Sequence, residues 1–126
     1  AGNIVPPLLK ELETAYAVLN LSLAIQSAVT LDRVGVGLTK SVYTEGGFRK
    51  NDAYNRLMTA FYPDKRFALT NLDEATAFGA AMLGKAALDG TGLEGLGGLF
   101  NIETQPVKPL ALPELAGYRK EWQKLL

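Results

Sequence analysis

The stretch EGGFRKNDAYN, residues 45–55, holds the residue types that could most readily do chemistry in this chain. Gly46 and Gly47 can adopt positive φ without strain, which lets backbone N–H groups approach a ligand closely. The helix expected next offers free N–H donors at its positive end, a favourable place for phosphate oxygens. Arg49 and Lys50 could add charge. Locally, the simpler interpretation is favoured, in which the glycines only turn the chain and Asn51 only caps the helix.

Composition excludes several other chemistries. The 126 residues contain no cysteine and no histidine, which excludes disulfide frameworks, Cys/His zinc sites, Cys–His dyads and Ser–His–Asp triads. Basic and acidic residues balance at 13 each, so net charge indicates neither a nucleic acid nor an anionic membrane as partner. The stretch GLTKS at 37–41 lacks the Walker A arrangement. The absence of cysteine fits a reducing compartment, and we expect a cytoplasmic protein.

Three carboxylates could be taken for catalytic or ligand-binding groups. Asp73 and Glu74 stand where a helix is expected to begin, and capping is the favoured interpretation for both. Glu45 could contact a ribose or a metal-bound water, but a solvated charge at a strand end is favoured. None of the three is therefore predicted to be catalytic.

The elements that must position these residues can be read from periodicity. Apolar residues at three- and four-residue spacing predict a helix from about residue 7 to 30. Residues 14–31 carry no charge but include six polar residues, so a core helix covered on more than one side is favoured over a membrane span, and no signal peptide is recognised. The remaining predicted elements are a strand at 40–45, a helix from Asn51 or Asp52 to Pro63, a strand over RFALT, a helix beginning at NLDE, an irregular Gly/Pro-rich connector at 90–113 and an amphipathic helix at 114–126.

Two details of these elements are specific enough to test. Asn71 as N-cap and Glu74 three residues later form a predicted capping box, and the helix they open carries a small-residue face suited to close packing. The last helix aligns an apolar face of Leu115, Tyr118, Trp122 and Leu125, which must cover something. Alternating strands and helices predict an α/β fold with parallel pairing. Two strands make a poor independent core, so the chain is interpreted as the end of a larger domain.

A longer pattern changes the interpretation of the glycine pair. The stretch from Glu45 to Leu88 resembles the C-terminal portion of FGGY-family carbohydrate kinases, in which a strand ends in Gly-Gly, an amide-bearing residue and a Tyr-Asn helix follow, and a Glu-Ala-Thr-x-Phe-Gly-Ala-Ala block comes after a further strand. Both blocks are present in order, as GGFRKNDAYN and EATAFGAA. The resemblance covers roughly residues 8–126 and is strongest from 42 to 88. The tail is more similar to the fuculokinase and rhamnulokinase side of the family.

This resemblance implies a partial ribonuclease-H-like, actin-type ATPase domain, in which ATP with Mg²⁺ lies between two lobes. Residues 1–89 would belong to the second lobe, 90–113 would be a connector, and 114–126 a helix packed on the same lobe. By position, Gly46, Gly47 and Phe48 would approach the nucleotide, and Asn51 would reach toward adenine. The family often has a small residue where Phe48 stands; here Phe48 could instead cover the base.

What the resemblance places elsewhere matters equally. In the family the catalytic base, the sugar contacts and the main phosphate-binding turns precede this region, so no catalytic residue or magnesium ligand is assigned here. We therefore expect the nucleotide-binding portion of an ATP-dependent sugar kinase that is inactive alone and has the preceding lobe as its partner, with no nucleic acid or membrane partner. Two alternatives stay open at this point: a part of an actin-fold ATPase of chaperone or filament type, and a stand-alone interaction module.

Overall fold

The computed structural model describes residues 5–72, 74–96 and 101–125. Its longest element is α1 (Leu12–Arg33), which is preceded by a 3-10 turn at Pro7–Lys10. The two are separated at Glu11, whose backbone is extended at φ −84° and ψ 121°. The single helix predicted from about residue 7 is therefore wrong before Leu12. Helix α2 (Asp52–Phe61) ends before Pro63, as predicted.

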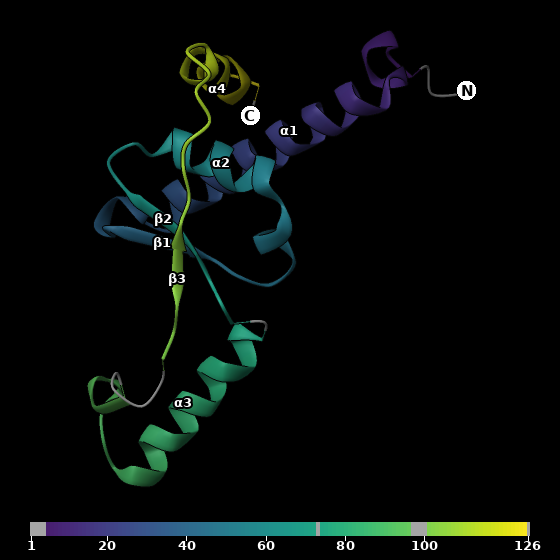
Figure 1. Cartoon of the computed structure of the whole chain (residues 1–126). Coiled ribbons are helices and arrows are strands. Elements are labelled where there is room, and N and C mark those ends of the chain that lie inside the picture. The colour runs from purple at the N-terminus through teal and green to yellow at the C-terminus, as the bar shows by residue number, and fades with distance from the viewer. Residues whose placement is uncertain (1–4, 73, 97–100, 126) are drawn as a thin grey trace.

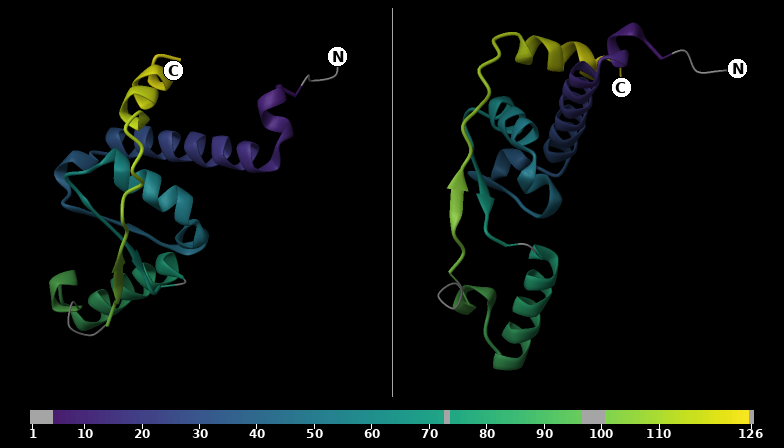
Figure 2. Two further views of the ribbon diagram at one scale, coloured as in Figure 1. Left: turned by 45° about the horizontal axis from the view of Figure 1, so that its top comes forward. Right: turned by 45° about the vertical axis from the view of Figure 1, so that its right-hand side comes forward.

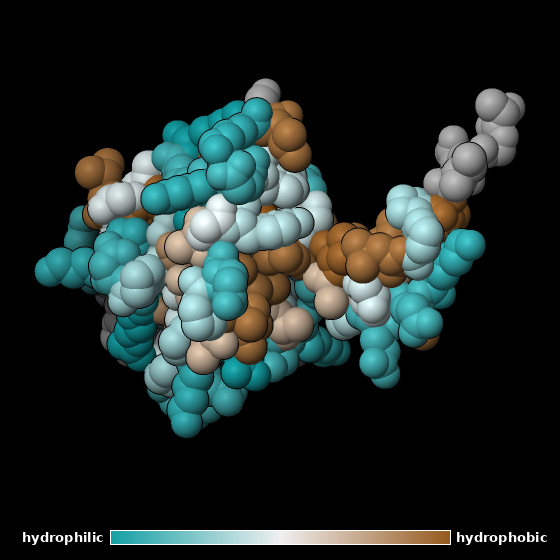
Figure 3. Space-filling view, turned by 90° about the horizontal axis from the view of Figure 1, so that it is seen from above, coloured by the Kyte–Doolittle hydropathy of each residue, from teal (hydrophilic) through white to brown (hydrophobic). Residues whose placement is uncertain are grey.

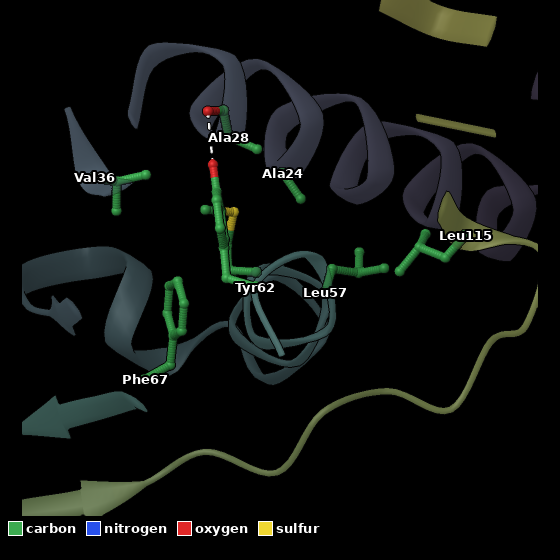
Figure 4. Packing of buried hydrophobic residues seen from close by; sticks show 8 residues of the cluster. Ala24, Ala28, Val36, Leu57, Tyr62, Phe67 and Leu115 are labelled. Carbon is green, nitrogen blue, oxygen red and sulfur yellow. Dashed lines mark hydrogen bonds between the residues drawn. The ribbon is translucent and has the colours of Figure 1, made fainter. Parts of the chain in front are cut away.

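The core lies between α1, α2 and one face of the sheet (Figure 4). Ala24 and Ala28 on α1 admit α2 closely, and Tyr62 fills the space between the helices and Phe67 of the sheet. Leu57 points the other way, toward Leu115. Burial and the nearby Asp32 carboxylate raise the pKa of Tyr62 to about 12. Its hydroxyl lies 2.8 Å from the Ala28 carbonyl oxygen and 2.7 Å from Asp32 Oδ1, and its single proton can go to either acceptor.

The sheet has the order β1-β2-β3 within the described residues. Strand β1 (Ser41–Thr44) pairs in parallel with β2 (Arg66–Thr70), as the alternation of elements predicted. Strand β3 (Thr104–Pro106) runs antiparallel to β2, with Leu69 opposite Gln105. The predicted irregular connector is therefore wrong at these residues. Pro106 is tolerated because it ends an edge strand, and the next residue, Val107, donates its N–H to the Phe67 carbonyl at 2.9 Å.

Helix α1 is enclosed from Asn20 onward, whereas most of its earlier residues are exposed. Ala24, Ile25 and Ala28 have no exposed surface, whereas Leu12 is 85% and Leu19 54% exposed. Figure 3 shows apolar surface along this projecting arm. The expectation of cover on more than one side is thus wrong for residues 12–19, most of which are exposed. Helix α1 is long and apolar enough to cross a membrane, but core helices of soluble proteins meet the same criteria of length and composition.

Helix α3 (Ala75–Asp89) extends away from α1 and α2 (Figures 1 and 2). The predicted capping box is wrong: Glu74 is the N-cap residue without a side-chain cap, and Asn71 is paired with Glu103. Asp73 lies outside the described residues. A Cβ added at Gly79 or Gly84 would meet nothing within 4 Å, so the small-residue face makes no close backbone contact with described residues.

Helix α4 (Leu115–Gln123) docks on α1 and α2 through part of the predicted face. Leu115 is buried and Trp122 is half-buried, but Tyr118 is 49% and Leu125 84% exposed. Arg119, outside the predicted set, adds a connection. Its guanidinium lies 2.5 Å from Asp32 Oδ2 and 5.1 Å from the ring centres of both Phe61 and Tyr62. Leu115 and Arg119 thus both hold the helix in place.

Candidate functional site

The Gly-Gly turn directly follows the carboxyl end of β1. Gly46 has φ +63° and opens a 3-10 turn, Gly46–Lys50, that leads into α2. A Cβ at Gly46 or Gly47 would meet nothing within 4 Å, so the turn is open to its surroundings. Glycine is required at Gly46 by its left-handed backbone, whereas neither backbone nor space requires it at Gly47 within the described residues.

The turn is fastened to the end of β2 on both sides. The Thr70 hydroxyl donates to Glu45 Oε1 at 3.1 Å, and Arg49 Nη1 donates to the Thr70 carbonyl at 2.9 Å. Glu45 thus serves as an acceptor within the fold, rather than as the solvated strand-end charge that was favoured from the sequence. These bonds fix the turn relative to the two parallel strands.

Asn55 holds the turn from beneath and was missed by the sequence reasoning. It is 2% exposed, and its Nδ2 donates to the carbonyl oxygens of Phe48 and Asn51, both at 2.8 Å. Its Oδ1 is buried and has no hydrogen-bond partner among the described residues. Its sequence signals are the Tyr-Asn pair of the family resemblance and its place inside a helix, where the low helix propensity of asparagine asks for a local reason. Here that reason is the fixed shape of the 3-10 turn.

Asn51 caps α2, as the local pattern predicted. Its Oδ1 accepts from the Tyr54 N–H at 3.0 Å, and its Nδ2 donates to Oδ1 of the buried Asn20 at 2.6 Å. Asn20 in turn donates to the Tyr16 carbonyl of α1 at 2.9 Å. This chain of bonds joins α1 to the start of α2. One amide proton and one lone pair of Asn51 remain for a ligand.

Phe48 borders a groove between α1, β1 and α2, with a volume of about 490 Å³. Its ring is 46% exposed and lies 4.6 Å from the Tyr54 ring, centre to centre, at a 43° tilt. The groove combines apolar walls with polar groups of Gln26, Ser27 and Glu45. A concave, mostly apolar space with a few polar groups and an aromatic edge suits a small planar ligand.

The acidic residues do not form a metal site in the parts of the chain described here. No group of three or more His, Cys, Asp or Glu side chains comes together there. Glu74 stands exposed at the start of α3. It occupies the N-cap position, but its side chain makes no capping hydrogen bond.

Comparison with known families decides the relationship. Residues 4–92 match the model of the C-terminal domain of FGGY carbohydrate kinases. The chain belongs to the FGGY carbohydrate kinase family. The matched range contains both blocks on which the resemblance rested, and the small α/β structure with its mixed sheet is consistent with the ribonuclease-H-like fold of that domain. No curated protein and no solved structure matches the chain.

For this FGGY chain, the family match separates two parts of the structure. Helices α1–α3 and strands β1 and β2 fall within the matched residues, whereas β3 and α4 lie after residue 92. The Gly-Gly turn, Asn51 and Asn55 are all in the matched part. The features that could serve a function common to the family are therefore the ones fixed by β1, β2 and α2.

Proposed function

We propose that this chain is the nucleotide-binding portion of an ATP-dependent kinase that phosphorylates a sugar hydroxyl. The observation that carries the proposal is the open, positive-φ turn at Gly46, which follows a parallel strand in an FGGY C-terminal domain and borders a groove of about 490 Å³. A glycine turn before a helix N-terminus offers backbone donors to phosphate oxygens. The groove beside it offers apolar walls to a base.

In this proposal Gly46 and Gly47 approach the nucleotide through their backbone. Phe48 covers the base from the rim of the groove, since its ring is exposed there and supported by Tyr54. Asn51 uses its remaining amide proton or lone pair toward adenine while it continues to cap α2. Asn55 is a positioning residue, because it holds the Phe48 and Asn51 carbonyls and not the ligand.

The residues described here do not fit a magnesium site, because no suitable set of carboxylates comes together among them. ATP would bring Mg²⁺ on its phosphates, with protein ligands outside this chain. We likewise place the catalytic base and the sugar contacts in a preceding lobe. The exposed arm of α1 is where that lobe would pack, and a cytoplasmic location suits a kinase of this composition. The domain division proposed is 1–89 with 114–126 as a helix on the same lobe, and 90–113 joins the two and contributes β3 to the sheet.

Nucleotide binding is tested by titrating ATP into the purified protein and following backbone amide signals by NMR. We expect shifts at Gly46, Gly47 and Phe48, and weaker binding by about tenfold in Phe48→Ala, since base–aromatic contacts contribute roughly 1–3 kcal/mol each. Tyr118→Ala on α4 is the matched control, because Tyr118 is 49% and Phe48 46% exposed. ATP binding that leaves the 46–51 signals unchanged, or that Tyr118→Ala weakens equally, would contradict the assignment.

The division of labour has its own test. A preparation of the 126-residue chain alone should not transfer phosphate from ATP to any sugar, because it carries no assigned catalytic base. Turnover of ATP with a sugar by this preparation, measured by phosphorylated product, would refute that part of the proposal. The protein joined to its preceding lobe should be active.

A further inference from the structure

A buried amide stands in the middle of α1, in a stretch of sequence that carries no charge. Asn20 is 2% exposed and is one of the six polar residues between positions 14 and 31. Asparagine has a low helix propensity, and burying its amide is unfavourable unless its hydrogen bonds are made. The partners of Asn20 therefore indicate why an amide stands at this position.

Asn20 is in the middle of a chain of hydrogen bonds that runs between two backbone groups. Its Nδ2 donates to the Tyr16 carbonyl oxygen at 2.9 Å, and its Oδ1 accepts from Asn51 Nδ2 at 2.6 Å. Asn51 Oδ1 accepts in turn from the Tyr54 N–H at 3.0 Å. The carbonyl at one end can only accept and the N–H at the other can only donate, so both amides are held in one orientation. Turning either amide over would bring oxygen against oxygen and N–H against N–H.

This orientation decides what Asn51 can offer to a ligand. Its side chain keeps one Nδ2 proton and one Oδ1 lone pair, each on a fixed side of the amide. Adenine carries an exocyclic amine that donates beside ring nitrogens that accept, whereas hypoxanthine carries a carbonyl oxygen in place of that amine. An amide that cannot turn over distinguishes these two bases better than one that can.

We propose that Asn20 is a positioning residue that gives the nucleotide site its preference for adenine, by holding the Asn51 amide in one orientation. The inference rests on the proposed nucleotide function, in which Asn51 reaches toward adenine. Asn20 is buried and bonded to Asn51, so it acts through Asn51 rather than on the ligand. If Asn20 only joined α1 to the start of α2, its loss would lower stability and leave the base preference unchanged.

The test compares ATP with inosine triphosphate, whose base is hypoxanthine, by NMR titration of the purified protein. The ratio of the two dissociation constants measures base preference, and a general loss of stability does not alter that ratio. Asn20→Leu is similar in size but offers no acceptor to Asn51, so the preference for ATP should fall about threefold to tenfold. If leucine does not fit and the variant fails to fold, Asn20→Ala removes the same acceptor.

Two matched variants separate positioning from stability. Thr59 is also buried and also donates to the carbonyl four residues earlier, at 2.9 Å, but it makes no printed-chain contact with the Asn51 side chain, so Thr59→Val should keep the wild-type preference within about twofold. Asn20→Asp keeps an acceptor for Asn51 Nδ2 in either protonation state, so it should keep most of the preference although its stability falls. The side-chain amide signals of Asn51 report the bond without nucleotide, and they should shift in Asn20→Leu but not in Thr59→Val.

The proposal is overturned if the wild type binds both triphosphates equally, if Asn20→Leu keeps the wild-type preference, or if Asn20→Asp loses it as fully as Asn20→Leu. In these cases the nucleotide assignment still stands, provided that ATP shifts the amides of residues 46–48 in the wild type. Failure of the nucleotide assignment would instead appear as absent ATP shifts at those residues. The role of Asn20 toward a ligand would then fail with it, whereas the Asn51 amide signals would still report the bond between the two side chains.

Discussion

Replacing Asn55 by aspartate tests the internal support of the Gly-Gly turn. The substitution keeps the size of the side chain but puts an oxygen where Nδ2 now lies 2.8 Å from the carbonyl oxygens of Phe48 and Asn51. Two hydrogen bonds are lost, and the new aspartate oxygen faces the two carbonyl oxygens that accepted them. The loss of the bonds alone costs about 2 kcal/mol of unfolding free energy.

The remaining cost of Asn55→Asp depends on pH. Asn55 is 2% exposed, so an aspartate there is desolvated and faces carbonyl oxygens, and its pKa in the folded protein rises above the unfolded value of about 3.9. A raised folded pKa means that the penalty is absent below the unfolded pKa and grows as pH rises toward the folded one. At 1.36 kcal/mol per unit, the variant should lose up to about 3 kcal/mol between pH 4.5 and pH 7.

Urea denaturation at pH 4.5 and pH 7 measures this difference against the wild type. Asn71→Asp is the matched control, because Asn71 is exposed and its side chain only accepts a hydrogen bond, from the Glu103 N–H at 3.2 Å. An aspartate can keep that bond, so its effect should stay within about 0.5 kcal/mol at both pH values. A pH-independent effect of Asn55→Asp would refute the assignment of Asn55 as a buried donor to the turn.

Three further experiments test separate parts of the fold. Gly46→Ala should destabilise by about 1–2 kcal/mol in thermal or urea unfolding because φ is +63°, whereas Gly47→Ala, without positive φ or a close neighbour, should be near neutral. In the wild type, the stability that Tyr62 contributes is fully present below its unfolded pKa of about 10 and is lost as pH rises to its folded pKa of about 12, a loss of up to about 3 kcal/mol. Tyr62→Phe has no hydroxyl to titrate, so its unfolding free energy should not show this loss. A double-mutant cycle on Arg119→Ala and Asp32→Ala should give a coupling of about 0.5–1 kcal/mol that salt reduces, and a coupling indistinguishable from zero would refute the role of this pair in docking α4.

The parts of the fold that the sequence predicted are those determined by local pattern. Helix α2 and the pair β1 and β2 follow from apolar periodicity and from the stop at Pro63. Strand β3 could not be found this way, because TQP has no apolar alternation and pairs only through the free edge of β2. The capping box failed for the same reason. Asn71 finds its backbone partner at Glu103, a contact distant in sequence.

The candidate site divides along the same line. The glycine pair and the cap at Asn51 are local and were visible in the sequence. Asn55 was not, because its function is to hold carbonyl groups four and seven residues earlier in a turn whose shape depends on Gly46.

The position of Asn55 under the turn predicts how the groove responds to its replacement. Its bonds hold the carbonyls of Phe48 and Asn51, and the same turn carries Phe48 to the groove. If ATP binds as proposed, Asn55→Asp at pH 7 should weaken ATP binding because the turn loses its internal support. Binding measured at pH 4.5, where the aspartate is neutral, should recover in part for Asn55→Asp, whereas Phe48→Ala should weaken ATP binding at both pH values. Equal weakening by Asn55→Asp at both pH values would show that a charge under the turn does not act on the groove.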